Sequence, residues 1–195
     1  MPISPDQKSN QKKLNSDFPR LLTTLKYKLL SGKIAPEEFR NILLEADQST
    51  GDRASSQYTY YFLKEPIIEK YFTKGDFKTN YLLFLSFTSF HFAQYVSIDK
   101  KNQTMALELF KESLSQLQKI PESEIGIDSI LYHKATIAYF SQDIKEMEKL
   151  KSQMNPKGNL SVNISVVERL INGIETYENV NYARDYLGVG KPERS

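Results

Sequence analysis

Only two histidines, His91 and His133, occur in the 195-residue sequence, and there is no cysteine. A histidine base beside a nucleophile is the usual requirement for nucleophilic catalysis, so these residues are the first place to look for an active site. Neither lies in a catalytic motif, and His91 falls within an apolar segment, as core histidines do. The lack of cysteine excludes thiol nucleophiles and zinc–thiolate sites from this sequence. We therefore predict no catalytic residues and a chain that is not an enzyme.

Motifs for phosphate and metal binding are incomplete. The run Gly188-Val189-Gly190-Lys191 is similar to part of a phosphate-binding loop, but it follows no predicted strand and opens no predicted helix. Residues 32–38 match the glycine, apolar and final glutamate positions of an EF-hand loop. Its earlier ligand positions would hold Tyr27, Leu29 and Ser31, which do not supply the carboxylates that Ca²⁺ requires. We predict no metal-binding residue and no cofactor.

A tyrosine cluster at Tyr58, Tyr60 and Tyr61 is the most suggestive binding feature. Such rings could stack on bases or grip a peptide. The alternative, which we favour, is a core position with the hydroxyls at the rim. Lysines 8, 12 and 13 are a small footprint for phosphate contacts, and the formal net charge is only +2. A continuous basic stripe beside residues 58–61 would favour nucleic acid, whereas mixed charge would count against it.

The elements that must position these residues are predicted to be helices. Apolar residues make up 39% of the chain, enough for a core, and no stretch alternates with the period of a strand. Residues 1–15 are polar and contain two prolines, which predicts a disordered tail, and 188–195 are predicted to be a flexible tail. Between them, 16–187 are expected to form a single all-helical domain. It would comprise an N-terminal helical hairpin at 16–47 and a helical-repeat-like body at 53–187.

Starts, stops and apolar periods predict the helices of that body. Pro66 is expected to kink or divide the helix that contains the tyrosine cluster. Asp143 and Glu146 form a capping-box-like start. The other expected helices are 81–96, 104–120, 127–140, 144–154, 162–174 and a short one at 182–187. Residues 81–96 are apolar on all sides, but they are fewer than the ~20 needed for a membrane span and include polar side chains, so we expect a buried central helix. With no secretory signal apparent at the N-terminus, a cytoplasmic location is expected.

The middle of the chain, 77–156, places small residues where paired helices would cross. Ala106 is followed one turn later by Phe110 and then by the small residue Ser113. In the next helix pair the matching positions are Leu131, Ala135, Ala138, Asp143, Met147 and Met154. This arrangement resembles a degenerate tetratricopeptide-like helical repeat, although the matched residues Ala106 and Met147 are 41 positions apart instead of ~34. The resemblance implies antiparallel helix pairs stacked as a short α-solenoid, a right-handed superhelix.

In that repeat register Tyr132, Thr136 and Tyr139 share one face of a helix, at i, i+4 and i+7, and would line the concave groove. The alternative is that both tyrosines pack against the next helix pair. We predict a non-enzymatic scaffold or interaction module that binds a protein or peptide through a helical surface. A nucleic-acid-associated protein and a structural subunit of a larger assembly are the alternatives.

Overall fold

The computed structural model describes residues 20–35, 37–38, 41–42, 54–72, 78–158, 160–177 and 180–188. Regular structure within these ranges is helical, with no strand, which confirms the all-α prediction. The chain divides into two compact units, Met1–Phe92 and Ala93–Ser195. The single all-helical domain that the sequence predicts over 16–187, with its body at 53–187, spans the boundary between these units. The predicted tails, 1–15 and 188–195, lie outside the described residues except for Gly188.

Unit 1 begins, in its described part, with a helix over residues 20–30. Leu22, Leu25 and Leu29 are buried along one side of it, at the spacing of an amphipathic helix. Gly32, with φ of 67°, ends the element in a left-handed conformation that glycine adopts without strain. Of the second helix of the predicted hairpin, only residues 37–38 and 41–42 are described, and they are helical.

The next two helices of unit 1 are α3 (Ala54–Leu63) and α4 (Pro66–Phe72). Pro66 is the first residue of α4, where its missing N–H is tolerated, so the predicted division at this proline is confirmed. The long helix α5 (Lys78–Val96) follows and extends past the unit boundary at Phe92. The Tyr81 hydroxyl donates to the carbonyl of Leu63 at 3.1 Å, which ties α5 to the end of α3.

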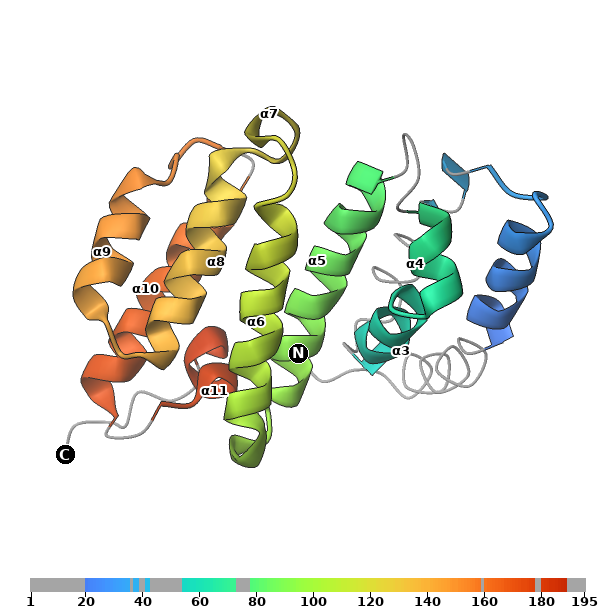
Figure 1. The fold of residues 1–195 in the computed structure, drawn as a ribbon. Coiled ribbons are helices and arrows are strands. Elements are labelled where there is room, and N and C mark those ends of the chain that lie inside the picture. The colour runs from blue at the N-terminus through green and yellow to red at the C-terminus, as the bar shows by residue number, and fades with distance from the viewer. Residues whose placement is uncertain are drawn as a thin grey trace, which may run out of the picture. The chain divides into compact units, whose positions relative to one another are not determined.

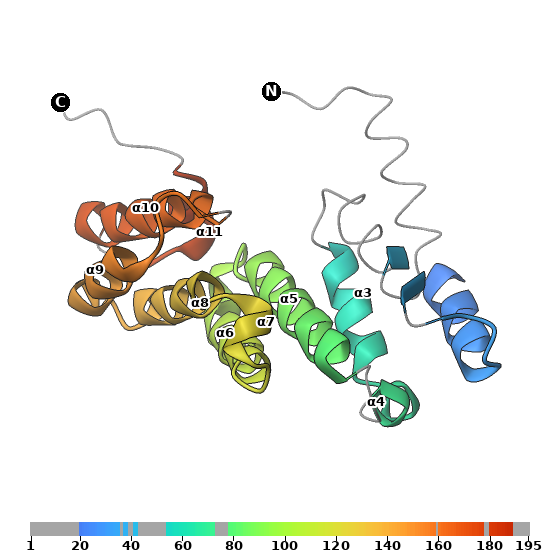
Figure 2. The same cartoon turned by 90° about the horizontal axis from the view of Figure 1, so that it is seen from above.

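Unit 2 contains a 3-10 turn, η2 (Lys100–Asn102), and the remaining described helices. These are α6 (Gln103–Leu117), α7 (Glu122–Ile125), α8 (Ile127–Phe140), α9 (Ile144–Gln153), α10 (Val162–Thr176) and α11 (Tyr182–Leu187). In Figure 1, α6, α8, α9 and α10 alternate in direction, so successive long helices of this unit are antiparallel. Seen from above, α8 lies between α6 on one side and α9 and α10 on the other (Figure 2), and α8 contacts all three.

Small residues are buried in both α6 and α8. Ala106, Ser113 and Ala135 are fully buried, and Ser113 on α6 lies beside His133 on α8. Small side chains at a helix contact allow two backbones to approach closely, and the larger side chains of Phe110 and Met147 are fully buried as well. Asp143 caps α9 by accepting a hydrogen bond from the N–H of Glu146 at 3.0 Å, which confirms the predicted helix start.

Candidate interaction surface

Tyr132, Thr136 and Tyr139, the predicted partner-binding residues, are all buried. Their exposed fractions are 7%, 0% and 0%. The Thr136 hydroxyl bonds back to the carbonyl of Tyr132 at 3.0 Å, and the Tyr139 hydroxyl donates to Asp185 on α11. The expectation that these side chains line an open groove is therefore wrong. Helical spacing placed them on a common face, but α8 is packed against several neighbours and that face belongs to the core.

His133 and Ser113 lie as close together as the histidine and serine of a catalytic pair. Nε2 of His133 lies 2.8 Å from the Ser113 hydroxyl, and Nδ1 lies 2.7 Å from the carbonyl oxygen of Ser129. A carbonyl only accepts, so the proton on Nδ1 is assigned by this contact. Both Ser113 and His133 are buried, with exposed fractions of 0% and 4%, which leaves no route for a substrate to reach the hydroxyl. This pair is a satisfied polar contact between α6 and α8.

Asp185 forms the centre of a second buried polar cluster that sequence reasoning missed. Its carboxylate accepts from the Tyr139 hydroxyl, from Nε of Arg184 at 2.5 Å and from Nη2 of Arg184 at 3.0 Å. The guanidinium in turn lies 3.6 Å over the ring of Tyr177. Tyr139 and Asp185 are 46 positions apart, so no local spacing could have revealed the contact.

The electrostatics of this cluster favour fixed protonation states. Burial raises the pKa of Tyr139 far above its usual value, and the hydrogen bond and negative charge of Asp185 raise it further. The same carboxylate raises the pKa of Arg184. The raised pKa values of Tyr139 and Arg184 keep both groups protonated, so that each can donate to the Asp185 carboxylate. Because the Asp185 side chain has no exposed surface, its carboxylate is closed to solvent and serves to join α8 and α11.

The exposed aromatic side chains of the described residues all lie in unit 1. Tyr27, Tyr58, Tyr61 and Phe87 have exposed fractions of 65%, 49%, 53% and 36%. In the described part of unit 2 the exposed large apolar residues are aliphatic or methionine, namely Ile98, Met105, Ile127, Leu160, Val162 and Leu187. Aromatic side chains are enriched at binding hot spots and rings left in water are unfavourable, so unit 1 carries the stronger candidate surface.

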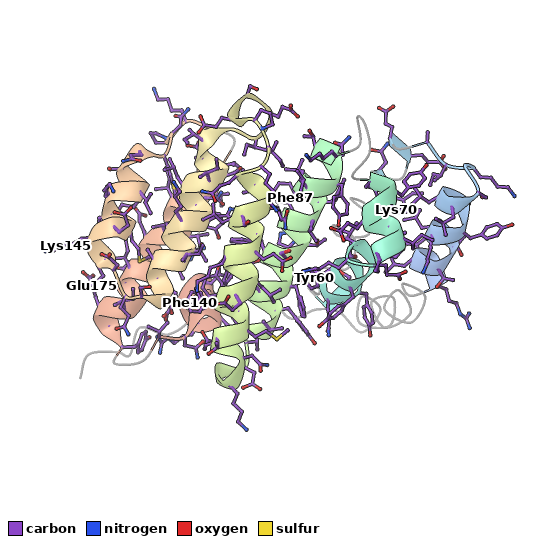
Figure 3. All side chains as sticks on the ribbon, in the orientation of Figure 1. Tyr60, Lys70, Phe87, Phe140, Lys145 and Glu175 are labelled. Atoms are coloured by element: carbon purple, nitrogen blue, oxygen red, sulfur yellow. The ribbon has the colours of Figure 1, made fainter. Side chains whose placement is uncertain are left out.

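The tyrosine cluster of α3 is split between core and surface. Tyr60 is buried, and its ring lies 5.5 Å from that of Phe92 (Figure 3 labels Tyr60). Tyr58 and Tyr61, three positions apart, lie on the opposite, exposed side of the helix. The ring of Tyr61 packs edge-on against Tyr60 at 5.3 Å and lies 5.8 Å from Phe92. The core interpretation is therefore confirmed for Tyr60 and wrong for the other two, and Tyr61 is held in place although half of it is exposed.

Among the described residues next to α3 in the chain, charges of both signs occur. No acidic or basic residue occurs in α3 itself. Just beyond its end, Lys64 lies 5.2 Å over the Tyr60 ring, and Glu65 forms an ion pair with Lys26. The segment Thr79–Val96 of α5 is also uncharged. Within the described part of the chain, these neutral helices do not form the basic stripe that nucleic acid needs, which counts against that alternative.

Searches for other kinds of site and for similar proteins add no candidate. Among the described residues, no three or more histidine, cysteine, aspartate or glutamate side chains gather as they would around a metal ion. No helix in the described ranges combines the length and the apolar character needed to cross a membrane. Comparisons with protein-family models, curated proteins and solved structures found no match.

Proposed function

We propose that this chain is a protein-binding or scaffold module and that unit 1 presents an uncharged aromatic helix face to a protein partner. The observation that carries the proposal is the pair Tyr58 and Tyr61 on α3, half-exposed and adjacent on one helix face. Tyrosine supplies a large contact area with only two rotatable side-chain bonds, so little conformational entropy is lost on binding. Ring contacts already fix Tyr61, which lowers that cost again.

The neutral character of α3 favours a protein partner with an apolar or aromatic contact face. A highly charged peptide or a nucleic acid would gain no ion pair on this helix, and its own charges would lose hydration on contact. A tyrosine hydroxyl can still bond to a partner or to water at the rim of an interface. A scaffold that recruits a folded protein or an amphipathic helix fits these properties best.

The tetratricopeptide-like arrangement stays part of this proposal. It is supported by the antiparallel helices of unit 2 and by the small buried residues of α6 and α8. The right-handed superhelix and the cytoplasmic location that the sequence predicts also stay part of the proposal. In such an architecture a helix surface, and not an enclosed pocket, binds the partner.

The test is quantitative affinity capture with two matched double variants. Tyr58→Ala with Tyr61→Ala removes the aromatic face, and Ile127→Ala with Val162→Ala removes two comparably exposed apolar side chains from unit 2. Partners captured by the wild-type chain should be reduced about tenfold or more by the tyrosine variant, because hot-spot truncations cost about 2 kcal/mol or more. The control should retain them, and the melting temperatures of both variants should stay within a few degrees of wild type because the replaced side chains are exposed.

A direct binding measurement with the purified partner then gives the change in Kd. Equal capture by the tyrosine variant and wild type would contradict the proposal. Tight binding of a single-stranded oligonucleotide, with an affinity that falls steeply as salt rises and depends on Tyr58 and Tyr61, would support the nucleic-acid alternative instead.

A further inference from the structure

The short helix α11 depends on unit 2 for its order. It has six residues, whereas isolated helices shorter than about 12 to 15 residues are marginal in water. Two of its residues, Tyr182 and Asp185, are nevertheless almost completely buried, with exposed fractions of 1% and 3%. They are three positions apart and so lie on the same side of the helix. Contacts with the rest of unit 2 must therefore supply the stability that the segment lacks by itself.

An aromatic socket receives Tyr182. Its ring stacks on Phe140 at 5.8 Å and 12° and lies 5.1 Å from Phe110 and 5.7 Å from Tyr139. Its hydroxyl accepts a hydrogen bond from Nε2 of Gln94 at 3.1 Å. The socket thus fits both the apolar ring and the polar tip of a tyrosine, and phenylalanine or leucine would leave the Gln94 amide without this partner.

A cradle on α10 receives Asp185. A Cβ atom on Gly173 would lie 2.2 Å from Cγ of Asp185, so only glycine allows the carboxylate to approach the helix this closely. From the groove the Tyr139 hydroxyl donates to this carboxylate, and the neighbouring Arg184 of α11 itself supplies the guanidinium that pairs with it. A buried aspartate with matched donors is a stringent recognition feature, because an apolar side chain at that position would leave the Tyr139 hydroxyl without an acceptor, and asparagine would remove the charge.

Both ends of the segment are also held. At the start, the Asn181 side chain accepts from the N–H of Arg184 at 3.1 Å and caps the helix. At the finish, Nε of Arg169 on α10 donates to the carbonyl of Tyr186 at 2.8 Å. Gly188 then adopts a φ of 67° in close approach to Arg169, where a Cβ would lie 2.7 Å from that residue's Cδ. Backbone, aromatic and charged contacts together specify this sequence.

We propose that the face of unit 2 formed by α6, α8 and α10 is a binding site for a short helix carrying tyrosine and aspartate three residues apart, and that α11 occupies it as an intramolecular ligand. This is recognition of a helix in a groove, with one aromatic anchor and one charged anchor. The ligand class is a peptide with the pattern Asn-Tyr-x-x-Asp-Tyr, as in residues 181–186. The site is distinct from the exposed tyrosines of unit 1, so the two proposals stand or fall separately.

The tether between α10 and α11 determines how such a site behaves. Only residues 177–181 separate the two helices, and a short tether gives an effective concentration on the order of millimolar. A free peptide must compete with that concentration, so the wild-type chain should bind added peptide weakly. A substitution that weakens the binding of α11 to the groove should therefore increase the affinity of the chain for added peptide.

The experiment is a fluorescence anisotropy titration with a labelled peptide of residues 180–188, VNYARDYLG, and the full chain. The Tyr182→Ala chain loses the anchor of its own α11 and keeps every groove residue. It should bind the peptide at least tenfold more tightly than the wild-type chain does. Peptides carrying Tyr182→Ala or Asp185→Asn should lose that binding. Equal affinity of the variant chain for the wild-type and the substituted peptides would overturn the proposal.

A second form of the protein keeps the test decisive if the Tyr182→Ala chain does not fold. A protease site inserted between Glu178 and Asn179 allows the tether to be cut after folding, with all anchors intact. The labelled peptide should then exchange into the cut protein, and an excess should release the cleaved segment. A cut protein that never exchanges its segment, or that unfolds when the segment is replaced by excess peptide, would show that α11 is an inseparable part of the core.

Discussion

Replacing Gly173 with alanine should destabilise unit 2 although alanine is the better helix former. Gly173 lies within α10, where the added Cβ would meet three atoms of Asp185, Cγ at 2.2 Å and Cβ and Oδ1 at 2.6 Å. These distances are all well inside van der Waals contact, so one of the two residues must move. The Asp185 side chain is fully buried and held by Tyr139 and Arg184, so it cannot yield without losing those donors.

Two opposing effects determine the size of the change. Alanine gains about 1 kcal/mol over glycine in a helix interior. Breaking a buried, hydrogen-bonded ion pair costs about 3 to 5 kcal/mol. The clash should dominate, and Gly173→Ala should lower the free energy of unfolding by about 2 to 4 kcal/mol. With a urea m value of about 2 kcal/mol/M, the unfolding midpoint should fall by about 1 to 2 M.

Urea unfolding followed by circular dichroism measures the change, and two further variants isolate its cause. Asn172→Ala, at the adjacent exposed position of α10, raises helix propensity without a clash and should leave the midpoint unchanged or slightly higher. Asp185→Gly removes all three clashing atoms. In that background Gly173→Ala should become neutral or stabilising, a strong departure from additivity. The proposed close approach would be refuted if the Gly173→Ala chain were as stable as wild type. It would also be refuted if the effects of Gly173→Ala and Asp185→Gly on the free energy of unfolding were additive.

Two further substitutions test other contacts of unit 2. Tyr139→Phe should lower the free energy of unfolding by about 1 to 3 kcal/mol at neutral pH by removing a donor to the buried carboxylate of Asp185. Because the pKa of Tyr139 is raised in the folded chain, its contribution is complete below about pH 10, where unfolded tyrosine is protonated, and is lost as the pH rises further. Above about pH 10 the free energy of unfolding, measured by urea titration, should therefore fall more steeply for wild type than for the variant, by up to about 1.4 kcal/mol per pH unit, and parallel curves between pH 10 and 11 would count against this raised pKa. Asp143→Ala should lower the same free energy by about 1 kcal/mol by removing the N-cap of α9, while Asp143→Asn should retain most of it.

Helix positions were largely predictable from the sequence because their signals are local. The observed bounds of α8 and α11 match the predicted ranges 127–140 and 182–187, and Pro66 divides α3 from α4 as expected. A proline, a glycine or a capping aspartate acts within one turn of its own position. The four-residue helix α7 was missed because it is too short to contain an apolar period.

The surroundings of each helix face could not be predicted in the same way. Spacing correctly placed Tyr132, Thr136 and Tyr139 on one side of α8, but periodicity does not state whether water or another helix covers that side. The buried contact between Tyr139 and Asp185 depends on chain segments 46 positions apart. Nothing in the sequence around Asp185 indicates that it is buried, since most aspartates in proteins are exposed.

The tyrosines of the two units show why stability and binding should be separable in this chain. A buried tyrosine needs a partner for its hydroxyl, and in unit 2 Tyr139 donates to Asp185 while Tyr182 accepts from Gln94. Each of these residues therefore supports the fold through both its ring and its hydroxyl. On α3 the half-exposed Tyr58 and Tyr61 have much less ring surface to lose on unfolding, because about half of each is already in water. Truncating them should change little in stability, and the apolar area that they leave open is the area a partner would gain by covering.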